Sequence, residues 1–133
     1  MHRVTWVLQV VLAIYFVATG ITHFVVPPGL PAPMEWMYDL STPLHLISGT
    51  VEILGGLGLV LPALARRSTA LVPAAAAGLG LVMVGAFFWH LPRGETQSMV
   101  SNVVLLALLA VVAVVRWRVH PLGGRARGSA LDT

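Results

Sequence analysis

Three residues of this chain have side chains that exchange protons and lie within or beside long apolar stretches. Glu52 is the one acidic residue placed inside such a stretch, and His23 and His90 each lie near the end of another. Loss of water contact favours the neutral form of a carboxyl group, and a carboxyl group beside a histidine can exchange a proton near neutral pH. These residues predict proton chemistry in an apolar environment.

The stretch that contains Glu52 has its small and polar residues on one helical face: His45, Ser48, Gly49, Glu52, Gly55 and Gly56. The opposite side is mostly leucine, isoleucine and valine. In the first apolar stretch, Thr5, Gln9, Gly20 and His23 fall within about 60° of one another around a helix. Polar groups in a membrane span usually face the protein interior or a cavity, so we expect both faces to point inward.

The composition is that of a membrane protein. Of the 133 residues, 57% are hydrophobic and only 10% are charged, and there is no cysteine. Four apolar stretches, about residues 4–26, 44–64, 70–89 and 99–115, have the length of about 20 residues that a helix needs to cross a bilayer. None alternates with the period of a membrane β-barrel strand. We predict an all-α integral membrane four-helix bundle and exclude an ordinary soluble enzyme.

The arginines predict the orientation of this bundle. If both termini are cytoplasmic, seven of the eight arginines are cytoplasmic and only Arg93 lies outside, as expected for connections that stay in the cytoplasm. We therefore expect a multi-pass protein of the inner (plasma) membrane. The net charge of only +3 makes no extended basic patch, so we expect no nucleic-acid partner. Residues 1–117 form one membrane domain, and residues 118–133 are predicted to be a basic, disordered cytoplasmic tail.

The connection between the first two spans is rich in proline and is predicted to be mostly non-helical. Within it, the segment MEWMYDL, residues 34–40, fits a short interfacial helix, because tryptophan and tyrosine favour the headgroup region. Its role is not indicated by the sequence.

The depths of the polar residues predict a pocket. At a rise of about 1.5 Å per residue, Glu52 lies roughly 13 Å below the outer start of its helix. Other polar residues lie near the outer ends of the remaining spans: His23, His90, Ser98, Ser101 and Asn102. We expect a polar pocket that opens to the outer face with Glu52 at its floor. In the cytoplasmic half, Gln9 is nearly alone.

Structural interpretations stand beside the functional ones. In the structural interpretation, Glu52 is a protonated acid that only bonds a neighbouring helix, His45 is an interfacial residue, and His23 and His90 are packing or interface residues. Met34, Met37 and Met83 are interpreted as loop or core residues. Ala74, Gly78 and Gly85 are interpreted as a close helix-packing face that permits a homo-oligomer.

The polar cluster suits three kinds of ligand. A quinone needs hydrogen-bond donors and a proton source for its carbonyl groups, and lipid access for its tail. Haem could take His23 and His90 as axial ligands, although such pairs usually lie deeper. A hydrolytic metal site could use His23, Glu52 and His90, but nothing in their spacing demands it.

Three segments resemble the DoxX-like family of small bacterial membrane proteins over about residues 4–117. They are GITHFVVP (residues 20–27), LISGTVEILGGLGLVLP (residues 46–62) and GAFFWHL (residues 85–91). The resemblance implies a four-helix membrane bundle and places His23, Glu52 and His90 on recurring positions of the family's pattern. It also implies association with membrane oxidoreductases that use quinones.

We expect an accessory subunit of a membrane redox system that binds a quinone or similar lipophilic ligand. Glu52 would relay a proton, and His23 and His90 would bond the polar head of the ligand. Ser48, Asn102 and His45 are the expected binding residues around them. The alternatives are a structural or adaptor subunit without enzymatic activity and, ranked lower, a haem b protein. The lipid bilayer and other oxidoreductase subunits are the expected partners.

Overall fold

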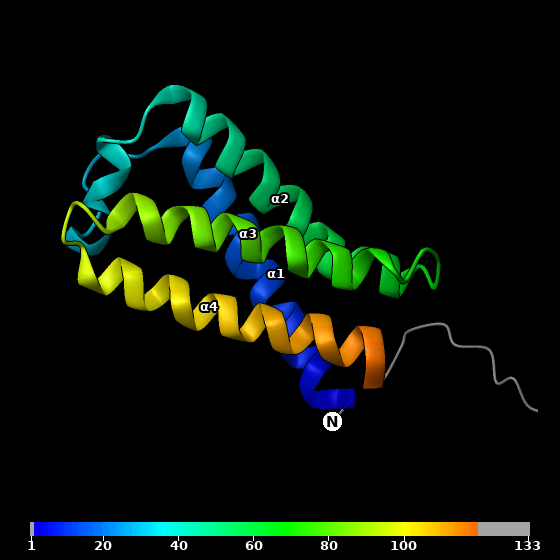
Figure 1. The fold of residues 1–133 in the computed structure, drawn as a ribbon. Helices are drawn as coiled ribbons and strands as arrows, with labels where there is room; N and C mark the ends of the chain where they lie inside the picture. The colour runs from blue at the N-terminus through cyan, green and yellow to red at the C-terminus, as the bar shows by residue number, and fades with distance from the viewer. Residues whose placement is uncertain (1, 120–133) are drawn as a thin grey trace, which may run out of the picture.

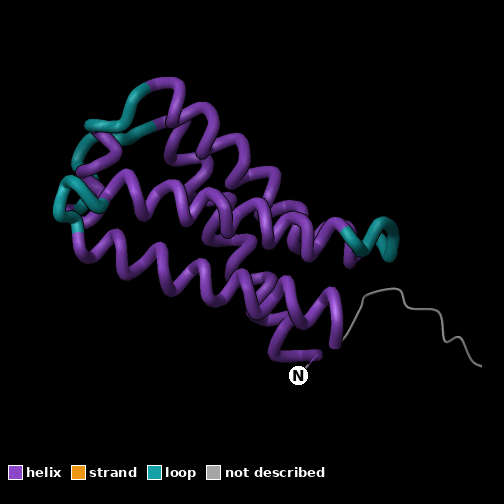
Figure 2. The backbone as a smooth tube through the Cα atoms, in the orientation of Figure 1, coloured by secondary structure: helices purple, strands orange, loops and turns teal. Residues whose placement is uncertain are grey.

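The computed structural model describes residues 2–119, which form helices joined by short connections (Figures 1 and 2). In chain order these are α1 (His2–Val25), the 3₁₀ helix η1 (Ala32–Tyr38), α2 (Thr42–Leu64), α3 (Leu71–His90), α4 (Thr96–Val114) and the π-helical segment η2 (Val115–Val119). Four helices are long and apolar enough to cross a membrane, and the described part of the chain contains no strand. The predicted four-helix membrane bundle is confirmed.

The helix bounds differ from the predicted spans mainly at α4. This helix begins at Thr96 rather than near residue 99, and helical structure continues through η2 beyond the predicted end at 115. The predicted interfacial helix over 34–40 is a 3₁₀ helix over Ala32–Tyr38. Pro31 is its N-cap residue, and Pro33 lies in its first turn. From residue 120 onward, the predicted tail lies outside the described residues.

The helices lie closer together at one end of the bundle than at the other. The chain packs α1 mainly on α2 and α3 mainly on α4, while α1 and α4 meet at few positions. In Figure 1, the end of α2 and the start of α3 lie together at the turn that joins them, and the two helices diverge toward the end that carries η1. The beginning of α1 and the end of η2 lie at the opposite end. η1 thus lies at the end where the helices diverge.

Two glycines allow α1 and α2 to come close beside the predicted site. A Cβ atom added at Gly49 would lie 2.9 Å from the carbonyl oxygen of Gly20, and one added at Gly20 would lie 3.0 Å from that of Gly49. The small residues predicted as a packing face on α3 behave differently. No atom lies within 4 Å of a Cβ added at Gly78 or Gly85, and Ala74 is exposed. That face packs on no other helix within the described residues.

The middle of the bundle is an apolar core, and the outer surfaces of the helices are apolar as well. Leu59, Leu79 and Phe16 are fully buried, whereas Leu81 and Val4 are among many large apolar side chains that are exposed. Exposed apolar side chains all along the helices are expected when lipid, rather than water, surrounds the protein. These surfaces and the four apolar helices indicate a multi-pass membrane protein.

Candidate functional site

The predicted polar residues meet beneath η1, where α1, α2 and α3 diverge. His23 comes from α1, His45, Ser48 and Glu52 from α2, and His90 from α3. His23 is 5%, Glu52 6% and His90 2% exposed. Buried polar groups of this kind must find partners or they destabilise the fold. The partners of each therefore indicate what the group can do.

Hydrogen bonds join η1 to His45 and His45 to His23, and His23 in turn faces Glu52. His45 Nε2 lies 2.9 Å from the carbonyl oxygen of Met37, and His45 Nδ1 lies 2.9 Å from His23 Nδ1. A carbonyl oxygen only accepts, so His45 Nε2 carries the hydrogen and a neutral His45 accepts at Nδ1. His23 then donates from Nδ1 and, when neutral, presents an unprotonated Nε2 to Glu52 Oε1 at 3.6 Å. His23 Nε2 and Glu52 Oε1 therefore face each other as a buried pair at a distance longer than a hydrogen bond.

The other oxygen of Glu52 meets a hydroxyl group that can serve either protonation state. Thr19 Oγ1 lies 2.9 Å from Glu52 Oε2 and 3.0 Å from the carbonyl oxygen of Tyr15. A hydroxyl group has one hydrogen to donate and also accepts. Thr19 can donate to an ionised Glu52, or it can donate to Tyr15 and accept from a protonated Glu52.

His90 is held by a different network, at the surface end of the site. His90 Nδ1 lies 2.5 Å from Glu95 Oε2, and Arg93 donates to Glu95 Oε1 at 3.0 Å and to Asp39 at 2.6 Å. Its hydrogen bond to Arg93, with a smaller contribution from His90, lowers the pKa of Glu95. An ionised Glu95 accepts the hydrogen of His90 Nδ1. Among the described residues, His90 Nε2 has no hydrogen-bond partner, so it remains available to a ligand.

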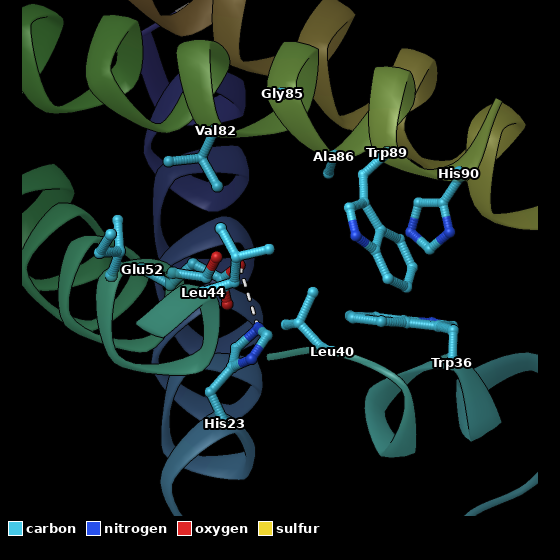
Figure 3. A pocket seen from close by; sticks show the side chains of 12 residues that line it. His23, Trp36, Leu40, Leu44, Glu52, Val82, Gly85, Ala86, Trp89 and His90 are labelled. Carbon is cyan, nitrogen blue, oxygen red and sulfur yellow. Dashed lines mark ion pairs between the residues drawn. The ribbon is translucent and has the colours of Figure 1, made fainter. Parts of the chain in front are cut away.

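Trp36 and Trp89 form the aromatic wall between the histidines. The Trp36 ring centroid lies 6.0 Å from that of His23, 5.0 Å from that of His90 and 6.0 Å from that of Trp89. Figure 3 shows Trp89 and His90 pointing from α3 toward Trp36 of η1. Arg93 lies over Trp89, with 4.4 Å from its guanidinium carbon to the ring centre.

Two cavities meet at this cluster, and both are lined by His23, Trp36, Glu52 and His90. The first, of about 250 Å³, lies between α2 and α3 and is otherwise mostly apolar. Leu44 and Ile47 line it, and their side chains are 39% and 60% exposed on the lipid-facing surface. This cavity therefore opens sideways between α2 and α3, on the surface that we expect lipid to cover.

The second cavity, of about 230 Å³, lies between α1, η1, α3 and α4, and its lining is more polar. It includes four polar residues of α4: Gln97, Ser98, Ser101 and Asn102. Asn102 is 9% exposed, and its Nδ2 group has no partner among the described residues. Gln97 and Ser98 also line a surface hollow with Glu35, Asp39 and Glu95. The second cavity therefore leads toward water.

Of the six predicted site residues, His23, Glu52 and His90 line both cavities. Ser48 lines the apolar cavity and Asn102 the polar one, while His45 lines neither and instead supports His23. The sequence did not predict five further residues of this site: Thr19, Trp36, Trp89, Arg93 and Glu95. Glu95, five residues after His90, was the nearest available signal, because a carboxylate often orients a functional histidine.

The metal and haem alternatives meet specific obstacles in this geometry. The described residues contain no group of three or more histidine, cysteine, aspartate or glutamate residues that could hold a metal ion. His23, Glu52 and His90 are therefore not arranged as the three-ligand centre considered above. A haem held by His23 and His90 would have to displace the indole of Trp36, which contacts both rings.

A second polar cluster lies at the opposite end, where the sequence predicted Gln9 to be nearly alone. That prediction was wrong. Gln9 Nε2 donates to the carbonyl oxygen of Leu59 at 2.6 Å, and Gln9 Oε1 accepts from Arg116 Nε at 2.5 Å. Arg116 was missed because it follows the last apolar stretch and was assigned to the cytoplasmic surface, whereas its side chain is only 2% exposed.

The sequence model of the DoxX-like family matches residues 7–112, which include most of α1 and all of η1, α2 and α3. Neither a curated protein nor a solved structure matches the chain.

Proposed function

The chain belongs to the DoxX-like family, and from this premise we propose that it binds the head group of a quinone or a similar lipophilic carbonyl compound. We propose further that it does so as an accessory subunit of a redox system in the inner membrane. One observation carries the proposal. The Glu52–His23 pair and His90 line a single cavity that opens between two lipid-facing helices.

The size and lining of the apolar cavity suit a ring with a tail. Pockets that enclose whole drug-sized ligands measure about 300–1,000 Å³, so a cavity of about 250 Å³ accommodates a head group and leaves the tail outside. The tail would leave past Leu44 and Ile47 into lipid. Trp36 and Trp89 would pack on the ring, as aromatic side chains do on flat ligands.

The polar groups would act on the ligand's oxygen atoms. His90 Nε2 donates to a carbonyl oxygen when protonated and accepts from a hydroxyl group when neutral. Glu52, which faces His23 at 3.6 Å, would give a proton to the ligand as the ring takes up electrons. Those electrons come from a partner oxidoreductase subunit in our proposal, and electrons and protons are taken up in equal number. The polar cavity beside Asn102 would return protons from the outer surface.

Tryptophan fluorescence of the purified protein tests ligand binding directly. A short-chain ubiquinone should quench the fluorescence of Trp36 and Trp89, so that Trp36→Phe and Trp89→Phe each lose a large part of the quenching. Trp117→Phe is the control, because Trp117 is 65% exposed at the other end of the bundle. Equal quenching in all three variants would place the quinone elsewhere and contradict the proposal.

Glu52→Gln tests the proton role. We expect normal expression, folding and partner association, with quinone-dependent turnover at least about tenfold lower, the usual scale for loss of a general acid or base. Thr50→Val is the matched control, since Thr50 is exposed on the same helix. Unchanged turnover would contradict the proton-transfer role of Glu52.

The structural alternative predicts another result for Glu52→Gln, because a residue that only fixes helix register would lower thermal stability without changing quinone affinity or turnover. The haem alternative is tested by the absorption spectrum of the purified protein. A Soret band in the wild type that is absent from both His23→Ala and His90→Ala would show that the ligand is haem and not a quinone.

A further inference from the structure

Arg116 forms a buried cationic site at the end of the bundle away from the candidate site. Its guanidinium group donates from Nε to Gln9 Oε1 at 2.5 Å and from NH1 to His2 Nδ1 at 3.0 Å. Its carbon atom lies 5.5 Å from the centre of the Trp6 ring. The NH2 group is buried and has no hydrogen-bond partner among the described residues. Two of the three nitrogen atoms are thus paired with neutral groups, and the third is not paired.

This end of the bundle has arginines and, within residues 2–119, no acidic residue. Arg3, Arg66, Arg67 and Arg118 are exposed there, in α1, the α2–α3 connection and η2. The four described acidic residues all lie in the half that carries η1: Glu35, Asp39, Glu52 and Glu95. No described ion pair includes Arg116. Its charge therefore has no anion among the described residues.

A buried charge without a counterion is costly, and an unpaired buried donor adds to that cost. Gln9 and a neutral His2 accept hydrogen bonds but bring no negative charge. Arg116 also lies in the π-helical segment Val115–Val119. Such segments are rare and recur at functional sites. The buried unpaired donor and the missing counterion indicate a site that an anion completes.

We infer that Arg116 binds the phosphate group of an anionic phospholipid in the leaflet that surrounds this end of the bundle. Arginine binds phosphate through two parallel hydrogen bonds from its planar fork. Because Gln9 already holds Nε, the terminal pair NH1 and NH2 is the edge left for that contact. Basic pockets beside membrane helices bind anionic lipid head groups on the same physical basis.

Binding requires a small local movement. His2, the first residue of α1, occupies NH1 in the structure, and NH2 is covered. The first turn of a helix frays easily, since its backbone donors lack partners within the helix. The phosphate takes the place of His2 on NH1 and also accepts from NH2, while Gln9 keeps the guanidinium in position. This site is separate from the proposed quinone site, so either assignment can fail without the other.

Native mass spectrometry and thermal unfolding of the whole purified protein test the inference. Phosphatidylglycerol should remain bound to the wild type and raise its melting temperature, whereas phosphatidylcholine and inorganic phosphate should not. In Arg116→Gln we expect retention of phosphatidylglycerol to fall at least about tenfold, the scale on which loss of one charged partner acts. Arg118→Gln removes the same charge from an exposed position two residues away and should retain the lipid within about twofold.

Gln9→Glu keeps the test decisive if Arg116→Gln does not fold. The substituted carboxylate supplies an anion next to Arg116 Nε, so this variant should be stable without phosphatidylglycerol and should gain no further stability from it. Two results would overturn the inference: the same phosphatidylglycerol-dependent stabilisation in Gln9→Glu as in the wild type, or equal lipid retention in Arg116→Gln and the wild type. Equal stabilisation by inorganic phosphate would overturn the lipid assignment.

Discussion

The two ends of this bundle each bury an ionisable side chain, but they surround it with different chemistry. Glu52 lies beside a histidine and a hydroxyl group, which can accept, share or return its proton. Arg116 lies beside an amide and an imidazole, and arginine cannot lose its proton at any relevant pH. The first cluster can become neutral by taking up a proton. The second can become neutral only by adding an anion.

This difference leads to different predicted ligands. A cluster that takes up and releases a proton suits a ligand whose own protonation changes, as that of a quinone does on reduction. A cluster with a fixed positive charge suits a ligand with a fixed negative charge, such as a phosphate diester. Substitutions at the two ends of the bundle test this contrast between proton exchange and anion binding.

Gln9→Leu should be the most destabilising. It leaves Arg116 Nε without its partner in an apolar interior and removes the side-chain hydrogen bond to the carbonyl oxygen of Leu59. Since the remaining charge cannot be neutralised, we expect a loss of about 3 kcal/mol in the free energy of unfolding, the usual cost of breaking a buried charged contact. His23→Leu is the comparison, because Glu52 can become neutral by taking up a proton. Thermal or denaturant unfolding should show a clearly smaller loss for His23→Leu, and equal losses would contradict the contrast.

Gly49→Ala should have the next largest effect, through geometry rather than charge. The added methyl group would lie 2.7 Å from Phe24 Cε2 and 2.9 Å from the backbone oxygen of Gly20, so α1 and α2 must separate. Overpacking of this kind costs about 1–3 kcal/mol, and it moves His23 away from Glu52. We expect weaker quinone binding together with a lower melting temperature.

Gly78→Ala is the control for that variant. No atom lies within 4 Å of the added methyl group, and alanine is favoured over glycine in a helix by roughly 0.5–1 kcal/mol. Unfolding experiments should therefore give opposite signs for the two substitutions. A fall of similar size in both would show that α1 and α2 do not depend on this close approach.

Asn102→Leu should separate stability from function in the polar cavity. The Nδ2 group of Asn102 is buried and has no partner within residues 2–119, so an apolar side chain of similar size should be neutral or stabilising by about 1 kcal/mol. If this cavity returns protons to Glu52, quinone-dependent turnover should fall although quinone affinity, measured by fluorescence, stays the same. Unchanged turnover would show that protons reach Glu52 by another route.

The sequence predicted the membrane bundle well because span length and apolar composition determine it almost alone. It also predicted the inward faces of α1 and α2, since helical periodicity brings Gly49 and Glu52 to the same side. It did not predict Trp36 between the histidines, because a proline-rich connection has no periodicity that reveals where it packs. Nor did it predict Arg116 against Gln9, a contact between residues 107 positions apart. An arginine at the end of an apolar stretch has the same pattern whether it faces water or the interior.

The smallest expected effect comes from the surface network that holds His90. Arg93 lowers the pKa of Glu95, so the folded protein keeps Glu95 ionised to a lower pH than the unfolded chain does. The stability that this contact adds is complete above the ordinary carboxyl pKa and is lost as the pH falls through the lowered one. We therefore expect the melting temperature of the wild type to decrease below about pH 4 more steeply than that of Glu95→Gln.

Glu35→Gln is the control for this last variant, because Glu35 is an exposed acid of η1. It should keep the acid sensitivity of the wild type. At neutral pH, Glu95→Gln should weaken quinone binding by no more than about threefold, because exposed ion pairs contribute little and the aromatic rings of Trp36 and Trp89 still hold His90 in place. A larger loss would mean that Glu95 sets the protonation of His90 rather than only its orientation. The proton would then be held at the surface end of the site as well as at Glu52.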